Sequence, residues 1–365
     1  MHKRLRYETS ARQGGQLNIL VLGGTGFLGA QVAQQCLVRG HNVSVFSRGL
    51  FVESPGYRLA GMATLKHVQH FYGDRNKGID ALKVLDDCWD VCIDLCGYTA
   101  PQVRESTTWL RDRVRHYIYI SAVRAFLPSP ERMINESSER YSPIDENITC
   151  VDNETYGPLK AACESIVNEI FEGRNTILRP QVMVGPNDLS GRMTYWLLRA
   201  KNQPVMLPGD GNDFLQVVDV TDVASFIVRV SENRYLGEFN LAGHKISWRA
   251  FSQLLGIQHG VWVNNQIIKN AGLTFRELPL FRPRGNNEAS YMNISHDKAV
   301  SCGFRISEMS DTISRIMEWI GHTDITKMIP DDIQHEQLSP EAEAQLIREQ
   351  LFFRAIQGWP FTKSY

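Results

Sequence analysis

Residues 18–29 read NILVLGGTGFLG, and this stretch decides the fold. The apolar run at 18–22 is typical of a parallel strand that is buried on both faces. It enters a glycine-rich turn, GGTGFLG, in which Gly23, Gly26 and Gly29 are spaced three residues apart. The amphipathic stretch that follows, AQVAQQCLVR, ends before Gly40, which is a helix stop signal. A second apolar run, NVSVF, occupies 42–46. This order of segments predicts a β-α-β unit.

The same alternation continues through the first half of the chain. We expect further strands at 65–72, 91–95, 116–120 and 176–179, and helices at 79–85, 101–114 and 156–171. Strands that alternate with helices predict an α/β fold with a doubly wound parallel sheet. After Pro180 the pattern is less regular. We expect a helix at 193–201, a loop over PVMLPGDGND at 204–213, a strand at 215–218, a helix at 220–229, a strand at 237–242, a helix near 311–320 and a last helix that begins at Ser339-Pro340-Glu341.

The three spaced glycines of the turn indicate a dinucleotide site. Gly23 permits the tight turn, Gly26 lets the backbone approach a pyrophosphate, and Gly29 lets the helix pack closely on the strand. The helix N-terminus then offers free N–H groups to the phosphates. A tight β-α turn without a ligand is the alternative.

The residues after the second and third strands indicate which dinucleotide is bound. A carboxylate at the end of the second strand would bind the ribose of NAD, but the sequence there has Ser47 and Arg48. The guanidinium suits the 2′-phosphate of NADP, so we expect NADP(H) to be preferred, with NAD(H) as the alternative. Asp74 is expected to accept a hydrogen bond from the adenine amino group. For Arg75 two places are open, beside the 2′-phosphate or in solvent.

Tyr156 and Lys160 are the candidate catalytic pair. They stand four residues apart in YGPLK, so they share one face of the expected helix. A nearby ammonium lowers the pKa of a phenol, which would let Tyr156 act as general acid or base on a carbonyl or alcohol. Lys160 would also hold the nicotinamide ribose. The alternative is an ordinary surface pair on a helix.

These motifs suggest a division of the 365 residues into two closely joined lobes. We expect a flexible tail at 1–16 and a dinucleotide-binding domain at 17–180, to which 215–242 returns. Residues 181–214 and 243–365 would form a smaller substrate-binding lobe with a helical C-terminal tail. The apolar residues of that tail would dock on the body or on a second subunit; they are Leu346, Leu351, Phe352, Phe353 and Trp359.

Composition excludes several classes of protein. With 39 Lys+Arg against 40 Asp+Glu, the net charge of −1 argues against a nucleic-acid partner. There is no apolar run of membrane-spanning length, and residues 1–16 lack the apolar core of a secretory signal. We therefore expect a cytoplasmic protein, with a short organellar transit peptide as the alternative interpretation of the first residues.

The seven cysteines predict neither disulfides nor a metal site. Their number is odd, and no CxxC or Cys/His zinc spacing is present. Cys88, Cys92 and Cys96 recur every four residues, which leaves a metal or redox site as the alternative to buried structural thiols. The usage fits a reducing compartment.

The chain resembles the extended short-chain dehydrogenase/reductase superfamily, in its NAD-dependent epimerase/dehydratase or isoflavone-reductase-like branch. The motifs that carry the resemblance lie between 18 and 242 and are GGTGFLG, YGDR, WDVCIDLCGY, YIYISAVRAF, YGPLK, LRPQVMVGP and VVDVTDVA. The resemblance implies a Rossmann fold and NAD(P)-dependent chemistry. It adds to the expected cofactor site Thr25, Phe27, Leu28, Cys96 and Gly97. Members of the superfamily often pair through the YxxxK helix, which makes a homodimer the expected assembly.

The sequence departs from the family pattern in two places. Ala122 stands where the family usually has a Ser or Thr that hydrogen-bonds the substrate oxygen. Ser121 is the candidate replacement, although neighbours on a strand point to opposite faces; Tyr98 or Thr99 is the alternative donor. Leu215 stands where nucleotide-sugar members have an arginine that grips the diphosphate, which argues against such a substrate.

These observations favour an NADPH-dependent reductase of a small organic metabolite, with Tyr156 as proton donor. Two alternatives stay open, an epimerase or dehydratase that keeps NAD(P) bound and a non-catalytic NADP-sensing protein. The expected substrate is apolar or aromatic, because aromatic residues of the second half could line a pocket. The other role for these residues is core packing; they are Trp196, Trp248, Trp262, Phe275 and Phe281.

Overall fold

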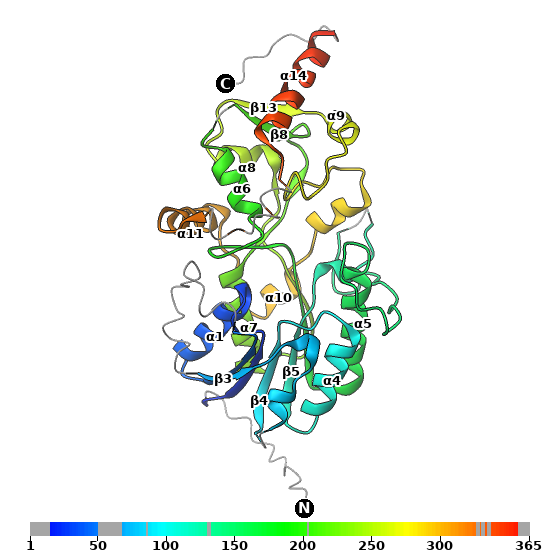
Figure 1. The fold of residues 1–365 in the computed structure, drawn as a ribbon, viewed down its shortest axis with the longest axis vertical. Helices are drawn as coiled ribbons and strands as arrows, with labels where there is room; N and C mark the ends of the chain where they lie inside the picture. Colours follow the sequence, from blue (N-terminus) through cyan, green and yellow to red (C-terminus); the bar gives the residue numbers. More distant parts are fainter. Residues whose placement is uncertain are drawn as a thin grey trace, which may run out of the picture.

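The computed structural model describes residues 15–49, 68–84, 87–129, 133–202, 204–325, 329, 333 and 337–356. A parallel sheet of seven strands, in the order β11-β6-β5-β4-β1-β2-β3, forms its lower lobe (Figure 1). Every pair of neighbours in this sheet is parallel. The strands are β1 (Asn18–Leu22), β2 (Asn42–Ser47), β3 (Gln69–Tyr72), β4 (Trp89–Asp94), β5 (Val114–Ile120), β6 (Asn175–Pro180) and β11 (Gly237–Leu241). The predicted doubly wound α/β fold is confirmed.

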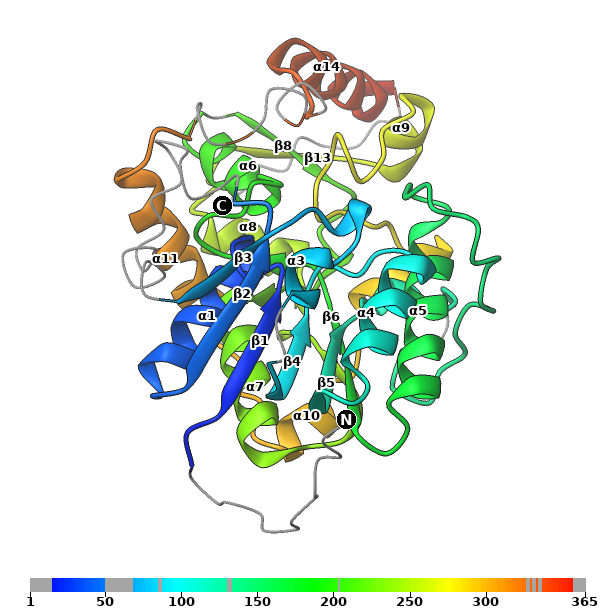
Figure 2. The same ribbon diagram turned by 60° about the horizontal axis from the view of Figure 1, so that its bottom comes forward.

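Helices cover both faces of the sheet, as Figure 2 shows. On one face α1 (Phe27–Val38) and α7 (Val220–Asn233) pack with alternate strand residues such as Ile19 and Val21. On the other face α4 (Ala100–Leu110) and α5 (Tyr156–Ile170) pack with Leu20 and Leu22. A strand with two buried faces explains why 18–22 is apolar at every position rather than at alternate ones.

Boundaries near α4 differ from the prediction. The helix begins after Thr99, whose side chain forms a capping box with Gln102, and it ends at Leu110 rather than at Val114. Val114 is instead the first residue of β5. Two short elements complete this lobe's connections, α3 (Asp80–Lys83) and the 3-10 turn η1 (Arg75–Lys77). Of the strand predicted at 65–72, residues 65–67 lie outside the described part of the chain, as do residues 1–14 and Trp359.

The second lobe has its own apolar core, above the sheet in Figure 1. Its elements are α6 (Arg192–Arg199), β8 (Val205–Pro208), β9 (Phe214–Leu215), β12 (Ile246–Ser247), α8 (Trp248–Leu254), β13 (Gly260–Val263), α9 (Asn265–Asn270), η3 (Asn287–Met292), α11 (Met309–Gly321) and α14 (Pro340–Ile356). Two further elements lie toward the sheet, the β7–β10 pair (Met183–Val184 with Val218–Asp219) and α10 (Asp297–Ser301).

The loop predicted at 204–213 is wrong in its first part. Val205–Pro208 is a buried strand, β8, that pairs in parallel with β13. Its apolar side chains gain a partner from a segment far along the chain, and a proline is tolerated at the end of a short strand. The strand predicted at 215–218 is likewise split, because Leu215 pairs with Ile246 while Val218 pairs with Met183.

The C-terminal helix α14 begins where the sequence indicates. The Ser339 hydroxyl accepts a hydrogen bond from the Ala342 amide at 3.2 Å. Leu346 is 4% exposed and packs into the core of the second lobe, whereas Phe352 is 70% exposed. No helix in the described part of the chain is long and apolar enough to cross a membrane.

Candidate dinucleotide and proton-transfer site

The glycine turn between β1 and α1 has the geometry of a phosphate cradle. Gly23 has φ +86°, a conformation that glycine adopts without strain. A Cβ atom on Gly29 would lie 2.1 Å from the Gly23 carbonyl oxygen, so only glycine fits at that contact. On Gly26 the nearest atom to such a Cβ would be the Gly23 carbonyl oxygen at 3.8 Å, an ordinary van der Waals contact, so the protein itself leaves room for a methyl group there.

The first turn of α1 is free to receive an anion. Gly26 precedes the helix without a side-chain cap, and the first turn contains no acidic residue. Thr25 and Leu28 are buried, and Phe27 is half-buried, so they fix the turn on the sheet. Free N–H groups at a helix N-terminus, beside a glycine whose missing side chain lets a ligand approach the backbone, fit a pyrophosphate.

Arg48 follows β2 at the same edge of the sheet. It is exposed and makes no hydrogen bond or ion pair with any described residue. Ser47, by contrast, is 7% exposed, and its hydroxyl lies 2.8 Å from Nε2 of His70. Asp74 caps η1 by accepting a hydrogen bond from the Asn76 amide at 3.0 Å. Arg48 is therefore the available cation here, and the Asp74 carboxylate is partly engaged.

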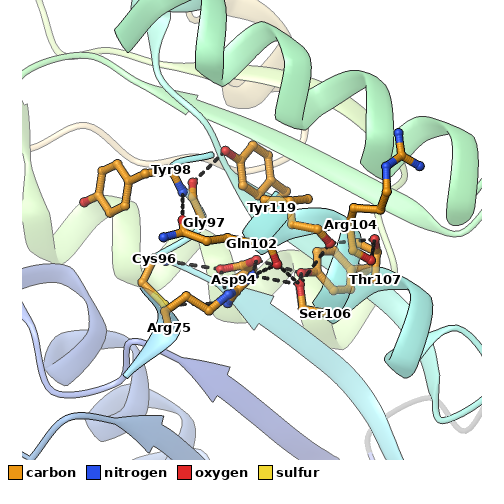
Figure 3. A network of polar contacts seen from close by, with 12 residues as sticks. Arg75, Asp94, Cys96, Gly97, Tyr98, Gln102, Arg104, Ser106, Thr107 and Tyr119 are labelled. Atoms are coloured by element: carbon orange, nitrogen blue, oxygen red, sulfur yellow. Dashed lines mark hydrogen bonds and ion pairs between the residues drawn. The ribbon is translucent and has the colours of Figure 1, made fainter. Parts of the chain in front are cut away.

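Arg75 takes neither of the two places expected for it. It is 7% exposed and turns inward beneath the sheet edge, where its guanidinium donates to Asp94 at 2.9 Å and to the Ser106 hydroxyl at 2.7 Å (Figure 3). Burial alone would raise the pKa of Asp94, but Arg75 and a hydrogen bond from Tyr117 hold that pKa below its ordinary value. Arg75 is thus committed to an internal ion pair and faces no solvent.

This ion pair supports the loop after β4. Asp94 accepts a hydrogen bond from the Cys96 amide at 3.2 Å, and Arg75 also reaches the Cys96 thiol at 3.7 Å. Cys96 packs against the first glycine, since a Cβ on Gly23 would lie 3.0 Å from the Cβ of Cys96. Burial raises the pKa of the Cys96 thiol to about 11. Cys96 is therefore a protonated packing residue at the floor of the turn.

Lys160 lies at the centre of the loop's other contacts. Its ammonium donates to the carbonyl of Gly97 at 2.9 Å, the carbonyl of Ile120 at 2.9 Å and the hydroxyl of Tyr119 at 3.1 Å. It also lies 4.8 Å from the centre of the Tyr98 ring. An ammonium has three donors, and all three are engaged. Binding a ribose through Lys160 would require one of these hydrogen bonds to break.

Tyr156 is the first residue of α5. Its pKa is not lowered by Lys160, contrary to the prediction from the sequence. Burial raises its pKa, and the nearby Tyr98 adds to the rise. The charges that oppose this rise come from Arg124 and Arg192, not from Lys160. Tyr156 therefore carries its proton at neutral pH.

The structure also distinguishes among the residues that could replace the hydroxyl which the family has at the position of Ala122. Ser121 is 3% exposed and faces the Glu164 carboxylate, whose pKa it helps to lower without forming a well-aligned hydrogen bond. The Thr99 side chain is committed to capping α4. Tyr98 is 42% exposed and lies beside Tyr156, which makes it the more accessible donor. Ala122 itself is buried.

Three of the five aromatic residues that could line an apolar pocket pack into the core of the second lobe instead. Trp196, Trp248 and Phe281 are buried in its core, with Trp196 and Trp248 packed edge to face at 5.0 Å. Phe275 is half-buried, and the guanidinium of Arg282 lies 4.4 Å from the centre of its ring. The residues that the sequence analysis did not single out here are Arg124, Arg192 and Arg282, which come together only in three dimensions.

The described residues hold no group of three or more His, Cys, Asp or Glu side chains suited to a metal ion. All seven cysteines are free. Cys92 is fully buried whereas Cys88 is exposed, so the two do not share a site.

The sheet order, the glycine cradle at the carboxyl end of β1 and the Tyr-x-x-x-Lys helix define a Rossmann-type protein that binds a nicotinamide dinucleotide. Residues 19–242 match the NAD dependent epimerase/dehydratase family, and the chain belongs to that family.

Two relatives with known names are similar in sequence. The chloroplast stem-loop binding protein of 41 kDa b from Arabidopsis thaliana is 25% identical over 264 residues, which are 67% of this chain and 66% of that protein. The bifunctional pinoresinol-lariciresinol reductase of Sinopodophyllum hexandrum is 22% identical over 225 residues, 59% of this chain and 66% of that protein. The chain thus spans just under two thirds of the length of each.

Solved structures share the fold at low identity. WbmG of Bordetella bronchiseptica, in complex with NAD and UDP, aligns with a TM-score of 0.62 and 16% identity over 88% of this chain and 99% of its own. Human SDR39U1, with NADPH, aligns with a TM-score of 0.55 and 19% identity over 82% of this chain and 99% of its own. These likenesses establish the architecture.

Proposed function

We propose that the protein is an NADPH-dependent reductase of a small organic molecule, with Tyr156 as the proton donor. The observation that carries the proposal is the state of Tyr156. A phenol keeps its proton at neutral pH, and the charges of Arg124 and Arg192 oppose the rise in pKa that burial causes, so Tyr156 can give its proton to a developing alkoxide. A base that must start as a phenolate would need the opposite shift.

The preference for NADPH rests on Arg48. It is the exposed, unpaired cation of the described residues at the end of β2, and a guanidinium binds a phosphate dianion in a bidentate manner. The cradle of Gly23, Gly26 and Gly29 would hold the pyrophosphate. NADPH, when bound, supplies the hydride.

The other residues of the site have supporting roles. When Tyr156 gives up its proton, the charges of Arg124 and Arg192 stabilise the phenolate. Tyr98 is the second hydrogen-bond donor, in place of the family hydroxyl at Ala122. Lys160 anchors the carbonyls of Gly97 and Ile120, which fixes the loop that carries Tyr98.

A titration of the full chain with NADPH, NADP⁺, NADH and NAD⁺ tests the cofactor assignment. We expect NADP(H) to bind at least about tenfold more tightly than NAD(H), and Arg48→Ala to erase the difference. Arg115→Ala is the matched control, because Arg115 is exposed at the amino end of β5, with a 3.7 Å ion pair to Asp90. Equal or tighter binding of NAD(H) contradicts the assignment and favours an epimerase or dehydratase that retains NAD.

Turnover then tests the role of Tyr156. NADPH consumption is followed with panels of ketones, imines and conjugated enones, and Tyr156→Phe is expected to lower kcat by about 10²–10⁴. NADPH affinity should stay unchanged, and Tyr72→Phe, at a residue 64% exposed, should keep full activity. A Tyr156→Phe variant as active as the wild type would remove Tyr156 from the chemistry.

A second candidate, a non-catalytic NADP-binding protein, is favoured by two observations. The ammonium of Lys160 is saturated by protein acceptors, and Ala122 offers no hydroxyl. This candidate predicts tight NADP(H) binding with no NADPH consumption by any member of the three panels.

A further inference from the structure

Three arginines from separate segments meet beside Tyr156. Arg124 lies in the 3-10 turn η2 (Val123–Ala125) after β5, Arg192 is the first residue of α6, and Arg282 lies in the loop before η3. Arg282 stands 4.4 Å from the centre of the Phe275 ring and Arg192 stands 5.7 Å from it. We call these residues the arginine cluster.

The second ring in contact with the cluster is that of Tyr291. Arg124 lies 5.2 Å and Arg282 lies 5.6 Å from its centre. Both are therefore ordered by stacking as well as by charge, since a guanidinium over an aromatic face is held by cation–π attraction.

The cluster has more positive charge than the carboxylates that touch it. Glu288, the carboxylate in contact, pairs with both Arg124, at 3.1 Å, and Arg282. Arg192 makes no hydrogen bond or ion pair with any described residue. Asp188 interacts electrostatically with Arg192 but does not pair with it, and burial raises its pKa.

Holding these cations together is costly without a further anion. Arg282 is 8% exposed, and burial, with Arg124 and Arg192, lowers its pKa to about 9. The Nε donors of Arg124 and Arg282 are buried and have no acceptor among the residues that the structure describes. The cluster therefore has hydrogen-bonding capacity that its protein contacts do not use.

We propose that the arginine cluster binds an anionic group of the substrate, a carboxylate or a phosphate, next to Tyr156. That the anion belongs to a substrate depends on the proposed function, whereas the presence of an anion site does not. The proposal replaces the expected apolar substrate with a small molecule that carries its charge at one end and its reducible group toward Tyr156. A small molecule fits better than a nucleic acid, because the backbone of a polymer does not reach a guanidinium that is 8% exposed.

Calorimetric titration of the full chain with inorganic phosphate, and separately with acetate, tests the site at constant ionic strength. The titrations are run with and without excess NADP⁺, so that phosphate binding at the glycine turn is recognised. We expect one of the two anions to bind with excess NADP⁺ present, and Arg192→Gln to weaken that binding at least about tenfold. Arg192 makes no hydrogen bond within the described structure, so this variant should fold, which its thermal melt checks.

Arg249→Gln is the matched control. Like Arg192, Arg249 is an arginine of the second lobe that lies over an aromatic ring, 5.4 Å from the centre of the Trp262 ring, but it is exposed and lies outside the cluster. Its replacement should change anion affinity by less than about twofold. A phosphate-only or acetate-only response identifies the group, and both support the proposal.

The proposal is overturned if neither anion binds, or if Arg192→Gln and Arg249→Gln weaken binding equally. It is also overturned if a single-stranded oligoribonucleotide binds through Arg192 while phosphate and acetate do not. The reductase proposal fails separately. If no dinucleotide binds but phosphate still requires Arg192, the anion site stands and the cofactor assignment falls.

Discussion

The buried ion pair between Arg75 and Asp94 supports the loop after β4, which packs against the glycine turn. Asp94 is fully buried, and its oxygens accept from Arg75, from Tyr117 at 2.7 Å and from the Cys96 amide. Removing one partner of such a pair leaves an uncompensated charge in the protein interior, whereas an exposed pair loses little.

Arg75→Met is expected to lower the free energy of unfolding by about 3–5 kcal/mol, measured by urea denaturation. The control is Lys83→Met, which removes the exposed pair with Glu105 at 2.8 Å and should cost less than about 1 kcal/mol. Adding Asp94→Asn to Arg75→Met should recover part of the loss, because the unpaired charge is gone. An equal cost for the Arg75 and Lys83 variants would show that the pair is not the support inferred here.

A buried histidine gives the fold a predictable response to acid. His116 is 2% exposed, hydrogen-bonded to Thr176 at 2.8 Å, and burial lowers its pKa from 6.5 to about 3. The unfolded chain binds a proton at this site between those values and the folded chain does not, so stability falls as pH falls through that window. Between pH 6.5 and 5 the loss is about 2 kcal/mol. His116→Gln should flatten this part of the urea-stability profile, and an unchanged slope would contradict the assignment.

At the scale of elements, the β1–α1 turn separates two uses of glycine. Gly29 is required by packing, because a Cβ there would collide with the backbone of Gly23, whereas a Cβ on Gly26 would make only an ordinary van der Waals contact. The two positions therefore predict different phenotypes for the same substitution.

Gly29→Ala is expected to lower both stability and NADP(H) affinity, since its Cβ would lie 2.1 Å from a carbonyl oxygen. Gly26→Ala should leave stability unchanged or raise it by up to about 1 kcal/mol, yet weaken NADP(H) at least about tenfold by filling the space for the pyrophosphate. Thermal melts and dinucleotide titrations measure the two effects. Gly321→Ala, at the end of α11 with no atom within 4 Å, should alter neither. Tight binding by the Gly26 variant would place the phosphates elsewhere.

At the scale of the whole molecule, the two lobes differ in how well sequence specifies them. The sheet lobe could be predicted because each strand and helix is encoded locally, by an apolar run such as 18–22 and the glycine turn after it. The second lobe is built from long-range pairs, such as β8 with β13, so a run bounded by prolines was interpreted as loop.

The candidate site could likewise be predicted from the sequence only in part. The cradle of Gly23, Gly26 and Gly29 follows from local spacing, and Arg48 follows from its place after β2. The inward turn of Arg75 could not be predicted, because it depends on Asp94 and Ser106 from other segments. The arginine cluster joins the sheet lobe, through Arg124, to the second lobe, through Arg192 and Arg282, and no single stretch of sequence contains it.

The two halves of the last helix, α14, are expected to contribute differently to the stability of the second lobe. Leu346 on α14 is 4% exposed within the lobe's core, whereas Phe352, two turns further on, is 70% exposed. Leu346→Ala should therefore lower the free energy of unfolding by about 2–4 kcal/mol, because it leaves a cavity, while Phe352→Ala should change it by no more than about 0.5 kcal/mol. Urea denaturation at two protein concentrations measures both. If Phe352→Ala costs as much as Leu346→Ala, and the cost grows with protein concentration, then Phe352 is buried between subunits and the helix belongs to an interface rather than to the surface of one chain.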